Sequence, residues 1–247
     1  MQLDRVIAVR NSKTIYHDGD QCVKVFGNGY SLSDVLGEAM NQSLMAECGL
    51  RVPAVREVCR INDRWTIVSE YVRGLTLAQE MQAYPERRDD CFRLMAALQR
   101  TIHQKRCARL PQLKEKLAAR IARADIAPAM RESFLARLAC LPGGECICHG
   151  EFKPSNVIRE PDGALCILDW HRAARGDGAA DAAQAYVAFL LKDEPENAER
   201  YIACFAREAG TTEGEIRAWI PVVAAAGMAL GNARERRTLH DRILKNA

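Results

Sequence analysis

A change in residue pattern near position 72 constrains the fold of this 247-residue chain more than any other feature of its sequence. Before position 72, short segments alternate between apolar and polar residues, and polar turns such as Asn11 to Lys13 and Asp18 to Asp20 separate them. Such alternation is typical of half-buried β-strands. After position 72, apolar residues recur every three or four positions, which is the period of an amphipathic α-helix. Strands followed by helices predict an α+β protein with two parts, residues 1–72 and residues 73–247.

The first part is predicted to be a small five-stranded antiparallel sheet with one helix. The helix extends from Ser31 to Cys48, where Ser31 or Ser33 is a suitable N-cap and Gly49 follows the last turn. Short polar turns between neighbouring segments favour hairpins, which pair their strands antiparallel. The five strand segments, in chain order, are Val6–Arg10, Thr14–His17, Gln21–Phe26, Val58–Ile61 and Trp65–Glu70.

The second part is predicted to be larger and mainly helical. Its first helices are followed by a β-rich stretch that includes Glu145 to Cys148 and Leu165 to Leu168. From Ala179 onwards the pattern is helical again, with breaks at Pro195, Gly210 and Gly231. The helical segments before the β-rich stretch are Leu77–Ala83, Asp89–Arg106, Leu113–Arg123 and Pro128–Leu141.

The composition excludes a disordered chain and gives little support to binding of nucleic acid or membranes. With 48% hydrophobic and 27% charged residues, the chain can bury a core. A formal net charge of +3 is too small to predict a polyanionic partner. No segment approaches the roughly 20 consecutive apolar residues of a membrane span, and the N-terminal residues do not form a secretory signal. We therefore expect a cytoplasmic protein that binds neither nucleic acid nor membranes.

The ten cysteines are interpreted as reduced thiols that serve as small core residues. The cluster of Cys146, Cys148 and His149 suggests a zinc site, but it lacks the paired, loop-separated spacing of such sites. Because the cluster lies in an alternating segment, we interpret it as part of a strand.

The segment from Cys148 to Asp169, CHGEFKPSNVIREPDGALCILD, indicates chemistry. It contains two short apolar strands, Asn156 to Arg159 and Leu165 to Leu168, which flank the turn Glu160 to Gly163. Short strands around a Pro-Asp-Gly turn predict a β-hairpin.

Polar side chains stand at the open end of this hairpin. Asn156 begins the first strand and Asp169 follows the second, so their side chains should lie close together. An amide oxygen beside a carboxylate suits Mg²⁺, which prefers oxygen ligands and also bridges phosphates. Glu151, on the preceding loop, should face the same point and accept a proton from an attacking hydroxyl.

The same residues resemble the aminoglycoside phosphotransferase/choline kinase-like family of the protein-kinase-like superfamily. The pattern of that family is His-Gly-Asp, four residues, Asn, a hydrophobic strand that ends in Asp-Trp, and then Gly-Asp-Pro-x-x-Asp. The resemblance implies a two-lobed protein-kinase-like fold and an ATP-dependent transfer of phosphate to a small-molecule hydroxyl. The chain has HGEFKPSN, ILDW and GDGAAD in this order, and the matching residues are His149, Gly150, Asn156, Asp169, Trp170, Gly176, Asp177 and Asp181.

The resemblance also implies an ATP site in the first part. Lys24 would pair with the phosphates of ATP, and Glu38 on the following helix would orient it, although Asp34 is an alternative partner. The segment from Ile67 to Val72 looks like the hinge that holds adenine through its backbone, at Glu70 and Val72.

Roles in the second part follow in the same way. The resemblance implies that Asn156 and Asp169 bind Mg²⁺ and that His149 belongs to the catalytic loop, as an anchor rather than a proton carrier. Asp177 and Asp181 would brace that loop from the start of the next helix. Four further histidines receive no role at this point, namely His17, His103, His171 and His240.

Two departures from the family pattern affect the prediction. The first turn has no glycine-rich phosphate loop, so phosphate contacts there would come from backbone N–H groups or from Ser12 and Lys13. The position of the catalytic aspartate is Glu151, whose extra methylene moves the carboxylate by up to about 1.5 Å. A displacement of this size can cost a rate factor on the order of 10². The leading hypothesis is therefore an active phosphotransferase, with a nucleotide-binding pseudokinase as the alternative.

A small protein-serine kinase is less well supported, because only eleven residues separate Asp169 from Asp181, too few for a regulated activation loop. Aminoglycosides are polycations, yet residues 192–247 contain nine acidic and nine basic residues. Residues 86–143 contain 13 Lys and Arg against 6 Asp and Glu, which indicates either solvated helix faces or a surface for an anionic substrate. The family name is therefore no guide to the substrate.

Overall fold

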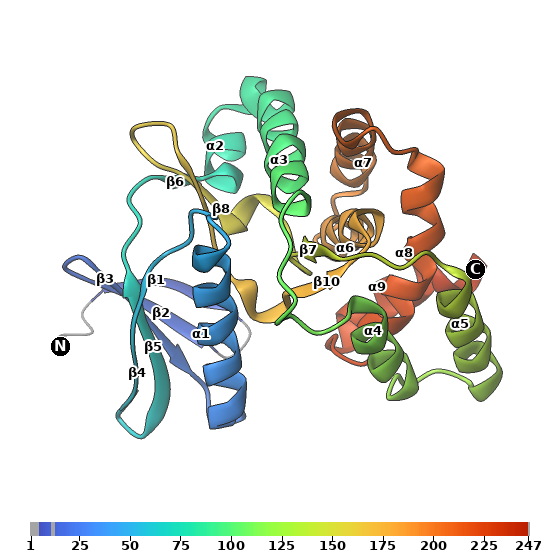
Figure 1. Cartoon of the computed structure of the whole chain (residues 1–247), viewed down its shortest axis with the longest axis horizontal. Coiled ribbons are helices and arrows are strands. Elements are labelled where there is room, and N and C mark those ends of the chain that lie inside the picture. The colour runs from blue at the N-terminus through green and yellow to red at the C-terminus, as the bar shows by residue number, and fades with distance from the viewer. Residues whose placement is uncertain (1–4, 11–12, 247) are drawn as a thin grey trace. The chain divides into compact units, whose positions relative to one another are not determined.

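The computed structural model describes residues 5–10 and 13–246, which form two compact units. The first unit comprises Met1–Ala83 and Ser155–Arg172, and the second comprises Tyr84–Pro154 and Ala173–Ala247. A five-stranded antiparallel sheet forms the N-terminal part of the chain, and the C-terminal part is mainly helical (Figure 1). The predicted α+β fold class is thus confirmed. The predicted boundary between two lobes at residue 72 stays a prediction, since the two compact units are defined by packing and not by function.

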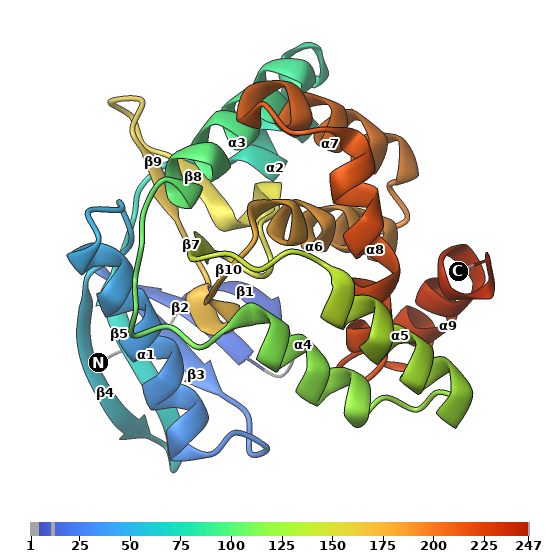
Figure 2. The same cartoon turned by 45° about the vertical axis from the view of Figure 1, so that its right-hand side comes forward.

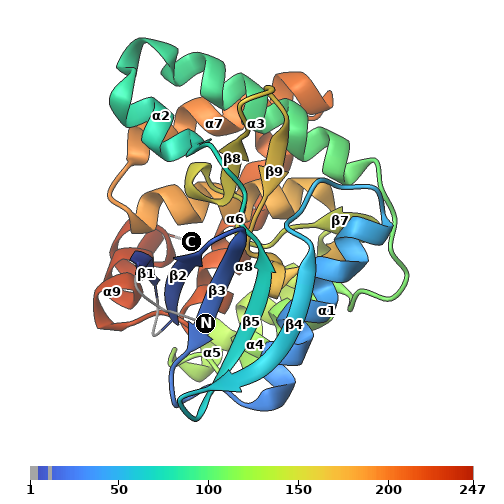
Figure 3. The ribbon, with the colours of Figure 1, turned by 90° about the vertical axis from the view of Figure 1, so that its left-hand side faces the viewer.

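The five-stranded sheet has the strand order β1-β2-β3-β5-β4, and every neighbouring pair is antiparallel (Figure 3). The short turns Gly19–Asp20 and Asn62–Asp63 close two of its hairpins, with positive φ angles at Gly19, Asn62 and Asp63. The strands are β1 (Arg5–Arg10), β2 (Lys13–Asp18), β3 (Gln21–Phe26), β4 (Val55–Ile61) and β5 (Arg64–Glu70).

Helix α1 (Leu32–Glu47) packs on one face of this sheet. Ser31 caps it, because the Ser31 hydroxyl accepts the Asp34 N–H while the Asp34 carboxylate accepts the Ser31 N–H. Such a reciprocal cap satisfies two backbone donors that the helix itself leaves unpaired. Val35 and Ala39 are buried on the side of α1 that contacts Phe26 of β3. The cap and this apolar side fix the rotation of α1, and with it the direction of its polar residues.

A second, three-stranded sheet of the first unit has the order β6-β8-β9. It consists of β6 (Leu75–Thr76), β8 (Val157–Arg159) and β9 (Leu165–Ile167), and helix α2 (Leu77–Ala83) follows β6. The hairpin predicted between β8 and β9 is confirmed. The strand β6 was not predicted. Gly74, directly before it, allows β6 to pair with β8, because a Cβ atom at Gly74 would lie 2.0 Å from the Arg159 carbonyl oxygen. Only glycine allows this close approach of two backbones.

The second unit is mainly helical and contains the short antiparallel strand pair β7 (Cys146–Cys148) and β10 (Ala174–Gly176) (Figure 2). Its core includes large buried side chains such as Phe92, Phe189, Tyr201 and Trp219. The breaks predicted at Pro195, Gly210 and Gly231 all lie at helix boundaries. The helices are α3 (Arg88–His103), α4 (Leu113–Ala122), α5 (Pro128–Cys140), α6 (Gly178–Leu191), α7 (Pro195–Ala209), α8 (Glu213–Gly227) and α9 (Ala233–Arg242).

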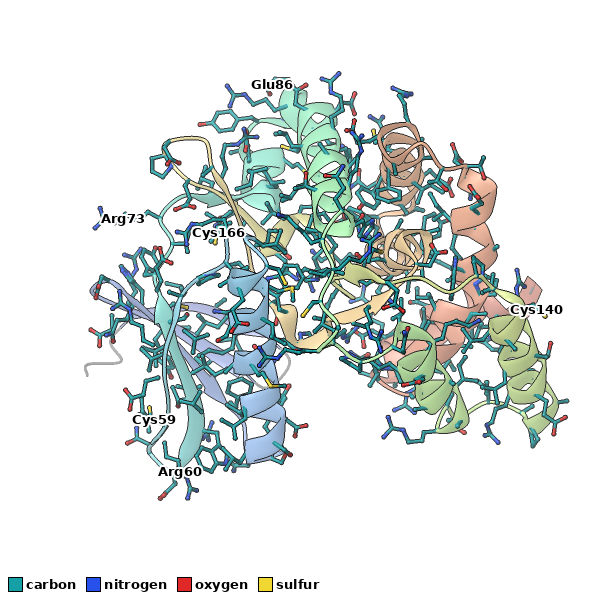
Figure 4. All side chains as sticks on the ribbon, in the orientation of Figure 1. Cys59, Arg60, Arg73, Glu86, Cys140 and Cys166 are labelled. Atoms are coloured by element: carbon teal, nitrogen blue, oxygen red, sulfur yellow. The ribbon has the colours of Figure 1, made fainter. Side chains whose placement is uncertain are left out.

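All ten cysteines are free thiols, and half of them are buried. Cys140 is the exposed exception, at the end of α5 (Figure 4). Cys146 and Cys148 lie in β7, as the strand interpretation predicts, and their sulfur atoms are 3.9 Å apart. In the part of the chain that the structure describes, no helix is long and apolar enough to cross a lipid bilayer.

Candidate functional site

Lys24 of β3 is the centre of a buried charge cluster in the first unit. Its Nζ atom donates a hydrogen bond to Glu38 Oε1 at 2.6 Å and lies 3.5 Å from Asp169 Oδ1. The ion pair expected between Lys24 and Glu38 is therefore present, whereas the alternative partner Asp34 caps α1. Burial disfavours the charged form of Lys24, but the charges of Asp169 and Glu38 outweigh it and raise the lysine pKa.

The two carboxylates of this cluster are held in the ionised state. Burial opposes ionisation of Asp169, but Lys24 and a hydrogen bond from His171 hold the pKa of Asp169 well below its ordinary value. Lys24 and Lys13 together lower the pKa of Glu38 in the same way, against the effect of its burial. The cluster thus presents ionised carboxylate oxygens at neutral pH, which are the ligands that Mg²⁺ prefers.

The backbone at Asp169 is unusual, because its φ angle is +67°. Left-handed conformations are uncommon for residues other than glycine and cluster at functional sites. Asn156 lies on the opposite strand end, where its carbonyl oxygen accepts the Leu168 N–H at 2.8 Å, and its side chain is fully buried. The hairpin therefore places Asn156 and Asp169 at its open end, and the approach of their side chains to each other stays a prediction.

Arg51, a residue that sequence analysis overlooked, ties this hairpin to the predicted hinge within the same unit. Its guanidinium donates to both carboxylate oxygens of Glu70, at 2.6 and 2.7 Å, and of Glu160, at 2.8 and 2.9 Å. Its carbonyl oxygen accepts the Ile167 N–H at 2.9 Å. The Glu70 side chain is thus occupied, which leaves the adenine contact predicted at Glu70 and Val72 to the backbone of this segment.

The second unit contains the loop with His149 and Glu151, and the buried Asp181 carboxylate binds the backbone of this loop. The fully buried Asp181 carboxylate accepts the backbone N–H groups of His149, at 3.1 Å, and Gly150, at 2.7 Å. Gly150 has a φ angle of +84°, a conformation that suits glycine. The predicted bracing role of Asp181 is present in the structure, and the neighbouring Asp177 caps α6 by accepting the Ala179 N–H.

His103 and Gln99 of α3 also bind Asp181, so His103, which received no role from the sequence, belongs to this site. Nε2 of His103 lies 3.0 Å from Asp181 Oδ2, and Gln99 donates to the same oxygen at 2.8 Å. Burial of the His103 ring opposes its protonation, but the hydrogen bond and charge of Asp181 outweigh it, and the pKa of His103 is raised. A buried aspartate with four donors requires a positive partner, which no sequence spacing revealed.

This pair predicts a pH-dependent contribution to stability. Because folding raises the pKa of His103, its contribution is fully present below the unfolded-state value of about 6.5 and disappears as the pH rises through the folded-state value. We expect His103→Gln, which keeps a neutral donor, to lower the free energy of unfolding by about 1 to 2 kcal/mol at low pH. Urea unfolding at pH 6 and pH 9 checks this. A difference between the two proteins that is equal at both pH values contradicts it.

Glu151 is engaged by a residue of its own loop. The Lys153 ammonium donates to the Glu151 carboxylate, and both side chains are largely buried. The Glu151 N–H also donates to His149 Nδ1, at 3.2 Å. The Glu151 side chain, which is longer than the aspartate of the family pattern, is therefore held in place by Lys153. The loop that carries it is bound by Asp181. Of the predicted site residues, Ser12 alone lies outside the described residues.

Comparison with known proteins assigns this architecture to one family. A model of the phosphotransferase enzyme family matches residues 8–219. None of the curated protein sequences compared with the chain matches it.

Solved structures share the fold at low sequence identity. The choline kinase LicA from Streptococcus pneumoniae is 15% identical over 99% of this chain and 92% of that chain, with a TM-score of 0.68. An aminoglycoside-3'-phosphotransferase of type VIII is 21% identical over 91% of this chain and 92% of that chain, with a TM-score of 0.63. The aminoglycoside phosphotransferase APH(3'')-Id from Streptomyces rimosus, in complex with ADP and streptomycin, is 17% identical over 88% and 91%, with a TM-score of 0.60.

Proposed function

The chain belongs to the phosphotransferase enzyme family, and from this premise we propose that it transfers the γ-phosphate of ATP to a hydroxyl group of a small molecule. One observation supports this proposal above all, namely the Lys24 ammonium placed between Glu38 and Asp169 at 2.6 and 3.5 Å. A buried cation fixed by two ionised carboxylates is ready to bind phosphate without rearrangement, and phosphoryl transfer depends largely on such positioning and on neutralisation of charge.

The proposed nucleotide contacts follow from the first unit. Lys24 binds the phosphates, with Glu38 as the residue that orients it. The backbone of Glu70 and Val72 binds adenine, while the bidentate bonds of Arg51 to Glu70 keep this segment in place. Ser12 remains a proposed phosphate contact. Solved structures of this fold contain nucleotides, since LicA was solved with AMP and the Streptomyces rimosus enzyme with ADP.

The residues at the hairpin end fit a magnesium ion. Asp169 offers an ionised carboxylate and Asn156 an amide, and hard cations bind such oxygen ligands. Asp169, Glu38 and His171 also place one possible ligand atom each within 4.8 Å of one another. Because Glu38 is occupied by Lys24, we assign the ion to Asp169 and Asn156. When bound, Mg²⁺ neutralises the charge of the transferred phosphate.

In the second unit, Glu151 is the proposed general base and His149 the anchor of its loop. The Asp181 carboxylate binds the N–H groups of His149 and Gly150, directly before Glu151, which limits the positions available to the Glu151 side chain. Glu151 would accept the proton of the acceptor hydroxyl, a contribution of about 10² to 10⁴ in rate. The ion pair with Lys153 also favours a second candidate, a pseudokinase that binds nucleotide without turnover, because a paired carboxylate is a weaker base.

Nucleotide binding is the first test of the proposed function. We expect millimolar ATP with Mg²⁺ to raise the melting temperature, because a ligand that binds only the folded state adds RT ln(1 + [L]/Kd) to the free energy of unfolding. At a concentration 100 times Kd the gain is about 2.7 kcal/mol. Differential scanning fluorimetry and calorimetry check this, with adenosine and ATP without Mg²⁺ as controls. No shift and no heat of binding with ATP would remove the basis of the proposal.

The acceptor is then found by measuring ADP release with a panel of hydroxylated compounds. The panel includes sugars, amino alcohols, nucleosides and aminoglycosides, since the solved relatives comprise choline kinases and enzymes bound to streptomycin or hygromycin B. Release that depends on one compound class, and mass spectrometry of the phosphorylated product, would identify the substrate.

A further inference from the structure

A second lysine, Lys13, shares the Glu38 carboxylate with Lys24. Lys13 Nζ donates to Glu38 Oε2 at 2.7 Å, and Lys24 Nζ donates to Glu38 Oε1 at 2.6 Å. Each oxygen of one carboxylate therefore has its own ammonium partner. Glu38 carries one negative charge, so neutrality of the two lysines also requires the charge of Asp169, whose Oδ1 lies 3.5 Å from Lys24 Nζ.

The register of the sheet explains why both lysines reach Glu38. Lys24 of β3 lies directly opposite Ile15 of β2, and Lys13 lies two residues before Ile15. Side chains of directly opposed residues, and of residues two apart on one strand, project from the same face of a sheet. The two lysines thus share the face that α1 covers. Lys13 is also the first residue of β2, within a stretch of the sequence, Val9 to Thr14, that contains no glycine.

Lys13 is buried with a single oxygen partner, Glu38, among the residues that the structure describes. Its side chain is 10% exposed, and Nζ lies 4.8 Å from the ring centre of Phe26 and 5.2 Å from that of Tyr30. The bond to Glu38 uses one of its three N–H donors, and among the described residues no second oxygen accepts from it. Ring faces attract the charge only weakly compared with an anion.

The charges of the whole cluster indicate the kind of ligand. Lys13 and Lys24 balance Glu38 and Asp169, so the cluster by itself is neutral. A divalent cation on Asp169 would make it positive by two charges, which only an anion of high charge can offset. From this geometry we infer that Lys13 is a second phosphate-binding lysine, which contacts the phosphates of the nucleotide in place of a glycine-rich loop. This inference rests on the proposed function, since it requires that the first unit binds a nucleoside triphosphate.

The test compares the Kd of ATP, ADP, AMP and adenosine by calorimetry for wild type and Lys13→Met, which keeps the length of the side chain. We expect Lys13→Met to weaken ATP binding by about 10- to 100-fold, the usual effect of one charge-assisted hydrogen bond. Adenosine binding should stay within about twofold of wild type, because it has no phosphate. Lys245→Met, which removes an exposed lysine of the second unit, controls for the change in net charge.

The outcomes separate the inference from the proposed function. If wild type binds no ATP, both fail. If wild type binds ATP and Lys13→Met binds it equally well, the inference alone is wrong. Equal weakening of ATP and adenosine would also overturn it, because Lys13 would then only support the fold. If Lys13→Met does not fold, NMR spectra of protein with ¹³C-labelled lysine provide a second test. The signal that is missing from the spectrum of Lys13→Arg belongs to Lys13. In wild type this signal should shift with ATP but not with adenosine.

Discussion

Asp169→Asn should lower phosphoryl transfer by about 10³-fold while the protein stays folded. The substitution keeps the size of the side chain but removes the charge that faces Lys24 at 3.5 Å and, in the proposed function, binds Mg²⁺. Metal-assisted stabilisation of a phosphoryl group is worth several kcal/mol, and each 1.36 kcal/mol is tenfold in rate. Folding should persist, because Lys24 keeps its bond to Glu38 at 2.6 Å.

The measurement is the rate of ADP release, together with the melting temperature with and without Mg²⁺ and ATP. Asp169→Asn should lose most of the shift that depends on Mg²⁺. Asp162→Asn is the matched control, since it makes the same change on the same hairpin, in the exposed turn, where Asp162 accepts the Ala164 N–H. Wild-type rates in Asp169→Asn would show that Asp169 binds no catalytic metal.

Local signals in the sequence account for most of the elements that surround Asp169. The Ser31 cap, the Pro-Asp-Gly turn before Ala164 and the alternation in Gln21 to Phe26 each act over a few residues, and each element is present where it was predicted. Strands β6 and β10, of two and three residues, have no such signal of their own. They exist because β8 and β7 offer unpaired backbone groups beside them, which is a tertiary effect.

The residues of the candidate site also fall into two groups, those that could be predicted from the sequence and those that could not. Asn156 and Asp169 were predicted because each stands at the end of a short predicted strand, and Lys24 because its segment resembles the strand that carries the nucleotide lysine in the family. Arg51 and His103 were missed, since their partners Glu160 and Asp181 lie 109 and 78 residues away along the chain. No local pattern contains such a pairing. The signal that remains is chemical, because a fully buried carboxylate such as that of Asp181 requires donors from elsewhere in its unit.

Glu151→Ala should lower turnover by about 10² to 10⁴-fold if Glu151 is a general base in a loop adapted to its length. The bond from the Gly150 N–H to Asp181 fixes the backbone directly before Glu151, as a loop adapted to this residue requires. In that case Glu151→Asp should not raise the rate. The shorter side chain withdraws the carboxylate by up to about 1.5 Å, both from Lys153 and from the acceptor hydroxyl.

A site that has decayed from an aspartate ancestor would behave in the opposite way, with Glu151→Asp faster than wild type. We expect the adapted base, because Lys24, Asn156 and Asp169 are all retained, and a decayed kinase would be expected to lose some of them. Basal ATP hydrolysis serves as the readout until the acceptor is identified, since water can replace it, and Glu196→Ala on the exposed first turn of α7 is the control. If wild type, Glu151→Ala and Glu151→Asp all hydrolyse ATP at background while still binding it, Glu151 is no base and the chain is a nucleotide-binding pseudokinase.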